Sequence, residues 1–186
     1  LLLFSVTGIT LNHAADIEAR PQVLNREARL PQPVLAQLEA TARGAAPASG
    51  REPRKAPLPE SLSQWLKGEL AVSAGSREAE WTEDEVYLPL PRPGGDAWVR
   101  IDLASGDVEY ELTDRGWISY LNDLHKGRNT GTAWVWFIDV FAVACLVFAV
   151  TGLFILKLHA ANRPSTWPLV GFGAALPVLL AILFIH

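Results

Sequence analysis

The sequence contains no methionine and a single cysteine, Cys145, so it cannot form an internal disulfide framework. Cys145 stands in an apolar run, where a small buried side chain is expected rather than a reactive thiol. A nucleotide-binding glycine loop, an H-E-x-x-H motif and a serine or cysteine nucleophile in a recognisable setting are also missing. These absences exclude unaided NAD(P)H or flavin chemistry, so any electrons would come from a partner or a quinol.

Charge is scarce beyond Arg128, where only Asp139, Lys157 and Arg163 carry it. The other charged residues crowd into positions 16–128, which indicates a soluble domain with membrane anchors. The net charge of −4 gives no sign of nucleic-acid binding. Because the chain opens inside a hydrophobic stretch and without methionine, we expect further residues upstream.

Three apolar stretches predict three transmembrane helices. The first stretch, Leu1 to Leu11, would span only about 16 Å as a helix, roughly half of a bilayer core, so we interpret residues 1–13 as the outer part of a first span. Ala133 to Leu156 has one charged residue and Trp167 to Ile185 has none. They predict further spans at residues 131–157 and 166–186.

The cations of the last link predict the orientation of the chain. Lys157 and Arg163 flank or occupy the link at residues 158–165, which contains no acid, so the positive-inside rule places it in the cytoplasm. Residues 14–130 would then face the periplasm from a bacterial inner membrane.

The polar region at residues 14–116 has the alternation and spacing of a small α+β domain. We expect a helix packed on an antiparallel sheet whose other face meets water. A β-hairpin turning at residues 104–107 is predicted because apolar residues alternate on both sides of a short polar loop. The expected helices are Gln32–Ala42 and Ser61–Leu70, and a serine is expected to cap the second one. Between them we expect a loop at Gly44–Pro59. The expected strands are Val86–Leu90, Val99–Leu103 and Val108–Leu112.

A further helix is predicted at Trp117–Lys126. Ile118, Leu121 and His125 share one face, so the histidine occupies a position where an apolar residue is expected. We interpret residues 117–130 as an amphipathic helix at the membrane surface, followed by a glycine-containing turn into the next span.

One short pattern occurs twice, as Phe4 to Gly8 and as Phe148 to Gly152. Both copies end in Thr-Gly inside a predicted span. Small residues allow helices to approach closely, and a threonine can bond its own preceding turn, so helix packing is the favoured interpretation over a cofactor role.

Several of these segments together resemble the PepSY-associated transmembrane helix family. The likeness rests on Thr7 to His13, Leu121 to Arg128, the turn at residues 102–107 and Thr151-Gly152, and it covers nearly the whole chain in the same order. Some relatives of that family are longer inner-membrane ferric-siderophore reductases that hold b-type haem between transmembrane histidines. The resemblance therefore implies a PepSY-like periplasmic domain and electron transfer towards ferric iron or a ferric siderophore, with the chain as a possible ferric reductase component.

The same resemblance implies a haem b site. A bis-histidine haem needs two imidazoles at one depth, which the topology provides through His13 and His125, with His186 as an alternative ligand. Lys126 and Arg128 are expected to pair with the haem propionates. The alternatives are that the histidines only bond backbone groups at the interface, or that they contact a metal or a siderophore.

A second hypothesis has no catalysis. In this hypothesis the chain is an accessory or assembly subunit whose periplasmic domain binds and regulates a protein partner.

Small-residue faces at Gly8 and at Gly171-Phe172-Gly173 favour a homo-oligomer or a place in a larger membrane complex.

Overall fold

The computed structural model describes residues 1–17, 20–45, 54–160 and 163–185. The chain divides into two compact units, residues 1–135 and residues 136–186. The first unit contains a six-stranded sheet and four helices, and the second contains most of α5 together with α6.

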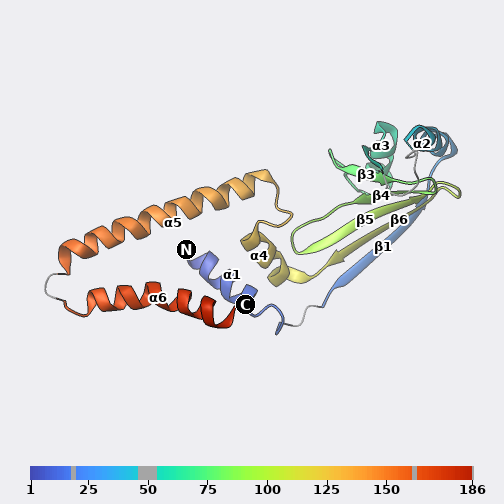
Figure 1. Cartoon of the computed structure of the whole chain (residues 1–186). Helices are drawn as coiled ribbons and strands as arrows, with labels where there is room; N and C mark the ends of the chain where they lie inside the picture. Colours follow the sequence, from blue (N-terminus) through green and yellow to red (C-terminus); the bar gives the residue numbers. More distant parts are fainter. Residues whose placement is uncertain (18–19, 46–53, 161–162, 186) are drawn as a thin grey trace. The chain divides into compact units, whose positions relative to one another are not determined.

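The first unit is built on one antiparallel sheet with the strand order β1-β6-β5-β4-β3-β2. Helices α2 and α3 cover one face of this sheet and leave the other face open (Figure 1). This architecture confirms the predicted α+β domain with one wet sheet face. The elements are β1 (Gln22–Arg29), α2 (Gln32–Ala45), β2 (Arg54–Pro57), α3 (Glu60–Glu69), β3 (Glu78–Trp81), β4 (Glu85–Pro89), β5 (Gly95–Asp102) and β6 (Asp107–Asp114).

The core lies between the sheet and these two helices. Alternate residues of the central strands face inward, and their burial removes apolar surface from water, which is the main force that holds the layers together. Trp81 is 1% exposed, and its Nε1 donates to the Ala56 carbonyl at 3.1 Å, so its polar atom is satisfied. The fully buried members include Leu38, Leu62, Leu66, Val86, Leu88, Val99, Ile101 and Val108.

The strands predicted from alternation are confirmed as β4, β5 and β6, whereas three others were not predicted. β1 is exposed at almost every position, so it has no alternating apolar pattern. β2 lies inside the segment predicted as a loop, and that part of the prediction is wrong. β2 and β3 are four residues each, too short to show a period.

The predicted serine cap of the second helix is also wrong. Pro59 is the N-cap of α3 and makes no side-chain cap bond. Ser61 lies inside the first turn, where its hydroxyl donates to Gln37 Oε1 of α2 at 2.8 Å. The serine therefore joins the two covering helices instead of starting one.

Helix α4 (Gly116–Lys126) matches the predicted amphipathic helix, and it ends at Gly127 in the left-handed conformation with φ of 67°. A glycine adopts this conformation without a Cβ penalty, which confirms the predicted stop. Helix α1 (Leu2–Asn12) precedes the sheet and ends at His13. Figure 1 shows α1 and α4 near one end of the sheet.

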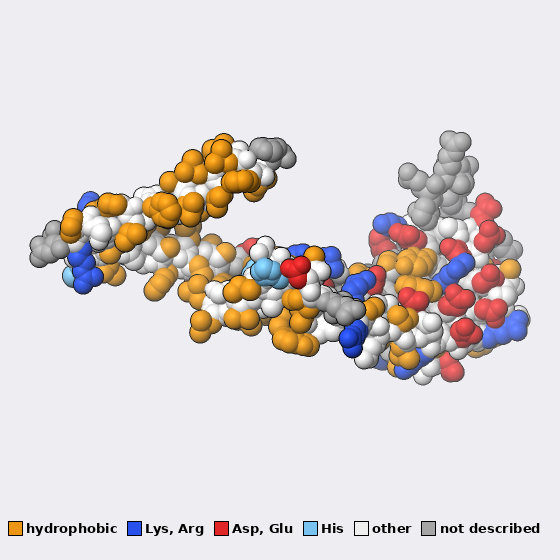
Figure 2. Space-filling model, turned by 90° about the horizontal axis from the view of Figure 1, so that it is seen from below, with side chains coloured by type: hydrophobic (Ala, Val, Ile, Leu, Met, Phe, Trp, Pro, Cys, Tyr) orange, Lys and Arg blue, Asp and Glu red, His pale blue; other side chains and the backbone are white. Residues whose placement is uncertain are grey.

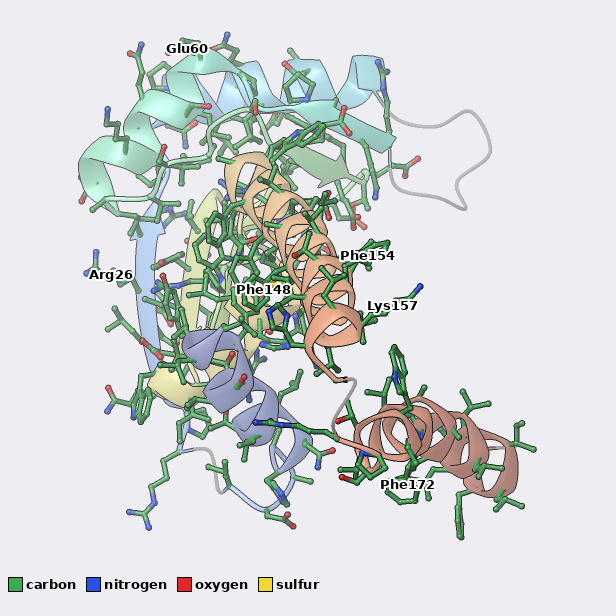
Figure 3. The ribbon with its side chains drawn as sticks, turned by 90° about the vertical axis from the view of Figure 1, so that its left-hand side faces the viewer. Arg26, Glu60, Phe148, Phe154, Lys157 and Phe172 are labelled. Carbon is green, nitrogen blue, oxygen red and sulfur yellow. The ribbon has the colours of Figure 1, made fainter. Side chains whose placement is uncertain are left out.

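Helices α5 (Thr132–His159) and α6 (Thr166–Phe184) are long and apolar enough to cross a membrane, by length and composition. None of their described residues is buried, and large apolar side chains extend from both, as at Phe154 and Phe172 (Figure 3). Two of the three predicted spans thus have helices of the required length. Helix α1 is a shorter apolar helix, and its place in a membrane stays a prediction.

Candidate functional site

The candidate site is the junction of α1 with α4, where polar side chains are buried. Thr7 of α1 and Asn122 and Asp123 of α4 are 4%, 8% and 4% exposed, and they are the buried polar residues in the described part of the chain. Burying a polar group costs free energy unless it is hydrogen-bonded. Each of the three side chains has a hydrogen-bond partner, so the helices meet through specific polar contacts.

Asp123 links α4 to the sheet. Its Oδ2 accepts a hydrogen bond from the Gly94 amide at 2.9 Å, and its Oδ1 lies 3.1 Å from Arg128 Nε. The Arg128 amide also donates to the Asp123 carbonyl at 2.9 Å. A buried carboxylate with a charged partner and a backbone donor is well satisfied, and it fixes the end of α4 against the loop that leads into β5.

Gly94 is required at this contact. Its φ is +75°, and a Cβ atom there would lie 2.7 Å from Tyr120 Cβ and 2.8 Å from Tyr120 Cα. Its carbonyl accepts from the Arg115 amide at 2.9 Å, just before α4 begins. Because it has no Cβ, Gly94 lets the backbone of α4 approach closely. Its carbonyl bonds Arg115 just before α4, and its amide bonds Asp123 near the end of α4.

Two polar pairs link α4 to α1. Thr10 Oγ1 lies 2.9 Å from Asn122 Oδ1, and Thr7 Oγ1 lies 2.7 Å from His125 Nδ1. The ring of Phe4 packs against the imidazole with centroids 5.2 Å apart. Asn122 and His125 are three positions apart, as are Thr7 and Thr10, so two polar rows meet along the facing helices.

The bond between Thr7 and His125 can form in either tautomer of the histidine. The Thr7 hydroxyl has one hydrogen, and its oxygen lies 2.9 Å from the Leu3 carbonyl, 3.2 Å from the Phe4 carbonyl and 2.7 Å from His125 Nδ1. When the hydrogen points at a carbonyl, the hydroxyl oxygen accepts from a proton on Nδ1, and when it points at the ring, Nδ1 accepts. In the first case the neutral imidazole presents its Nε2 lone pair, which is the state of a histidine that binds a metal through Nε2.

The space beside this imidazole is small. A cavity of about 10 Å³ is lined by residues of α1, α4 and the first turn of α5. That volume is about enough for one water molecule and not for a planar macrocycle. Trp134 closes part of it, with its Nε1 donating to the Leu124 carbonyl at 2.8 Å. The lining residues are Leu3, Phe4, Thr7, Leu121, Leu124, His125 and Trp134.

The structure does not bring the two predicted haem ligands together. His13 lies at the exposed end of α1, with its Nδ1 3.2 Å from Asp16 Oδ2. It is six residues beyond Thr7, which is about 9 Å along a helix axis. His125 has its Nδ1 bonded to Thr7, and the cavity beside it is too small for haem as the chain stands. The pairing of His13 with His125 on one haem stays a prediction.

The other predicted site residues have different positions. Lys126 is exposed at the end of α4, where it is accessible to an anion. Arg128 is already paired with Asp123. His186 lies outside the described residues. Of the predicted cations, Lys126 is therefore the one placed for a propionate.

Thr7, Thr10, Gly94, Asn122 and Asp123 were missed by sequence reasoning as functional residues. One signal was present: Thr7 and Thr10 place two hydroxyls on one side of α1, opposite the polar positions of α4. Their partners lie more than a hundred residues away in the chain, so a local pattern cannot identify them.

The family model described as PepSY_TM-like matches residues 1–186. Among curated proteins and solved structures, none matches the chain.

Proposed function

Because this chain belongs to the PepSY_TM-like family, we propose that it is a non-catalytic, membrane-anchored accessory protein. Its α+β domain binds and regulates a protein partner, and α4 carries the effect of binding to α1. Helices α5 and α6 supply the anchor, since both have the length and apolar composition of membrane spans.

The observation that carries this proposal is the arrangement of three polar residues on α4. Asp123 bonds the sheet through Gly94, whereas Asn122 and His125 contact α1. One helix of eleven residues therefore has separate polar contacts with the domain and with the apolar helix. A displacement of the sheet domain relative to α4 would strain the bonds between α4 and α1. Breaking them is unfavourable, because each buried polar group left without a hydrogen bond costs on the order of 1–3 kcal/mol of stability.

Hydrogen exchange of the full chain in nonionic detergent tests this role. Asp123→Ala removes the acceptor for the Gly94 amide, and we expect faster amide exchange in α1 as well as around Gly94. Asp84→Ala is the matched control, because the Asp84 side chain is exposed and the residue's bond to Leu103 uses its backbone carbonyl. If exchange in Asp123→Ala rises only beside the substitution and α1 is unchanged, the coupling role is wrong.

We propose haem b binding as a second candidate function, favoured by one observation. Thr7 Oγ1 lies 2.7 Å from His125 Nδ1, which leaves Nε2 as the ring nitrogen for iron, and haem would need more room than the cavity of about 10 Å³ beside this imidazole. Bound haem would supply one-electron chemistry for transfer towards ferric iron. His125 would hold the haem iron together with His13 or His186, and Lys126 would provide a cation for a propionate.

A visible absorption spectrum tests this candidate. The full chain is expressed with haem supplied and purified in detergent, and a Soret band with low-spin features is expected. His125→Ala should remove the low-spin features or the haem. His159→Ala is the control, because His159 bonds only its own helix through the Ile155 carbonyl among the contacts of the described chain. A wild-type protein without a Soret band would eliminate haem binding and leave the accessory role in place.

A further inference from the structure

The sheet face that α2 and α3 leave open has a regular pattern of charged side chains. Cross-strand pairing aligns outward positions into one row that runs across all six strands. Its members, in order from β2 to β1, are Lys55, Glu80, Tyr87, Arg100, Glu109 and Glu27. Because alternate residues of a strand point to opposite faces, these side chains share the open face with their i±2 neighbours.

This open face is strongly acidic. Its outward positions hold nine carboxylates and three cations, a net charge of −6, whereas the whole chain has a net charge of −4. Figure 2 shows acidic side chains gathered around a hydrophobic patch on the sheet domain. The carboxylates are Glu27, Glu78, Glu80, Glu85, Asp96, Asp102, Asp107, Glu109 and Glu111, and the cations are Arg29, Lys55 and Arg100.

The three cations of this face already have partners. Arg100 lies 2.8 Å from Glu85, Lys55 lies 3.5 Å from Glu80, and Arg29 lies 3.8 Å from Asp107. Glu27 and Glu109 stand directly opposite each other on β1 and β6. Like charges in opposed positions destabilise a sheet, so an added cation between them would be bound favourably.

Two aromatic rings form the centre of the face. Tyr87 and Trp98 stack with centroids 6.2 Å apart and an interplanar angle of 29°, and both are half-buried. Trp98 Nε1 donates to Glu111 Oε1 at 3.3 Å, which holds a carboxylate at the edge of the indole. Burial first, and then the nearby charges of Asp96, Glu80 and Glu111, raise the pKa of Tyr87 above its ordinary value. The rings thus lie in a negative potential.

We propose that this open face, centred on Tyr87 and Trp98, binds an extended arginine-rich segment of the protein partner. The inference rests on the proposed partner-binding function and specifies its surface and chemistry. A guanidinium can stack on an aromatic face and pair with a carboxylate in the same plane, which an ammonium does less well. The two stacked rings with Glu111 at their edge provide both contacts.

The test uses the full chain in nonionic detergent at low salt and a fluorescein-labelled hexa-arginine peptide as the probe. We expect saturable binding that weakens as salt is added, because the attraction is between exposed charges. Hexa-lysine should bind several-fold more weakly than hexa-arginine if stacking contributes. Failure of the wild-type protein to bind hexa-arginine overturns the proposal.

Two double variants of equal charge separate this face from general acidity. Glu109→Gln with Glu111→Gln should weaken peptide binding about tenfold. Glu60→Gln with Glu69→Gln removes the same charge from α3, on the helical side of the domain, and should change binding less than about twofold. Equal losses in the two variants would mean attraction to net charge alone and would overturn the proposed surface.

Two further measurements test the ring contact and the type of occupant. Trp98→Ala should weaken hexa-arginine binding about fivefold and remove its advantage over hexa-lysine. Calcium added at matched ionic strength should not displace the peptide, and complete displacement would indicate a site for small cations instead. If the peptide binds but Asp123→Ala leaves amide exchange in α1 unchanged, only the proposed coupling between α4 and α1 is overturned. If exchange in α1 changes but the peptide does not bind, only the proposed binding surface on the open sheet face is overturned.

Discussion

Thr7 Oγ1 and His125 Nδ1 lie 2.7 Å apart although 118 positions separate the two residues in the chain. The bond joins an apolar helix at the start of the sequence to the last helix of the sheet domain. Gly8 stands next to it, where a Cβ atom would lie 3.6 Å from His125 Cε1. The Thr-Gly pair of α1 therefore contacts the His125 imidazole in two ways. The Thr7 hydroxyl forms a hydrogen bond with the ring, and Gly8 allows the ring to pack closely against the backbone.

Thr7→Val should lower the free energy of unfolding of the full chain by about 1–3 kcal/mol, because His125 Nδ1 would lose its hydrogen-bond partner in a partly buried place. Thr7→Ser keeps the hydroxyl and should cost less. The measurement is denaturant unfolding in detergent. Thr151→Val is a matched control, since Thr151 bonds its own helix at the Val147 carbonyl and is exposed. Equal effects at positions 7 and 151 would contradict a specific role for the bond.

Gly94→Ala should destabilise the domain more strongly than most single substitutions, by about 3 kcal/mol or more, because its Cβ would overlap Tyr120 and its φ is positive. Thermal unfolding of the full chain measures the effect. Gly68→Ala is the control, as Gly68 lies in α3 with nothing within 4 Å of the added Cβ. It should be stabilising by about 0.5–1 kcal/mol. A mild effect at Gly94 would mean that α4 can move away from the sheet at little cost.

Tyr87 should ionise above its ordinary pKa of 10.0, chiefly because burial disfavours the phenolate. A raised folded-state pKa means that the folded protein retains the proton more strongly than the unfolded chain. The resulting stability is present below pH 10 and is lost as the pH rises through the folded-state pKa. Ultraviolet titration of the wild type against Tyr87→Phe isolates this tyrosine. A difference spectrum that titrates at or below pH 10 would refute the expected direction.

The predicted orientation places residues 14–130 in the periplasm. A cysteine introduced as Ser73→Cys, in a Cys145→Ala background, should react with a membrane-impermeant maleimide in intact spheroplasts. Ser73 is exposed and lies in the sheet domain, so its accessibility depends on the side of the membrane alone. Reaction only after lysis would reverse the orientation.

The sequence was sufficient to predict the elements whose burial has a period. Val99 and Ile101 alternate with less buried residues in β5, as the pattern indicated, whereas the buried residues of α4 are the polar Asn122 and Asp123 and not its apolar positions. The expectation that the threonine of each Thr-Gly pair bonds its preceding turn is confirmed, by Thr7 with Leu3 and by Thr151 with Val147. These features depend on residues within one or two turns of each other.

Features that depend on distant partners could not be predicted in the same way. β1 is held by pairing with β6 and shows no pattern of its own. His13 and His125 were expected at one depth from topology, but the pattern of each helix alone does not indicate that His125 contacts α1 at Thr7 and Gly8. The place of Asp123 depends on a backbone amide of Gly94, which has no signature in the sequence.

The pairing of β1 with β6 sets the order in which this domain can fold during synthesis. Gln22 pairs with Asp114, so β1, the first of the described strands in the chain, has its one neighbour among these strands in β6, the last of them. Strands β2 to β5 can pair as they emerge, whereas β1 must wait with its backbone groups unpaired. Long-range pairings of this kind are slow and leave an edge exposed to other chains. A ribosome pause or a truncation before residue 107 would therefore leave a chain whose strand β1, directly after the apolar helix α1, has no partner in the sheet.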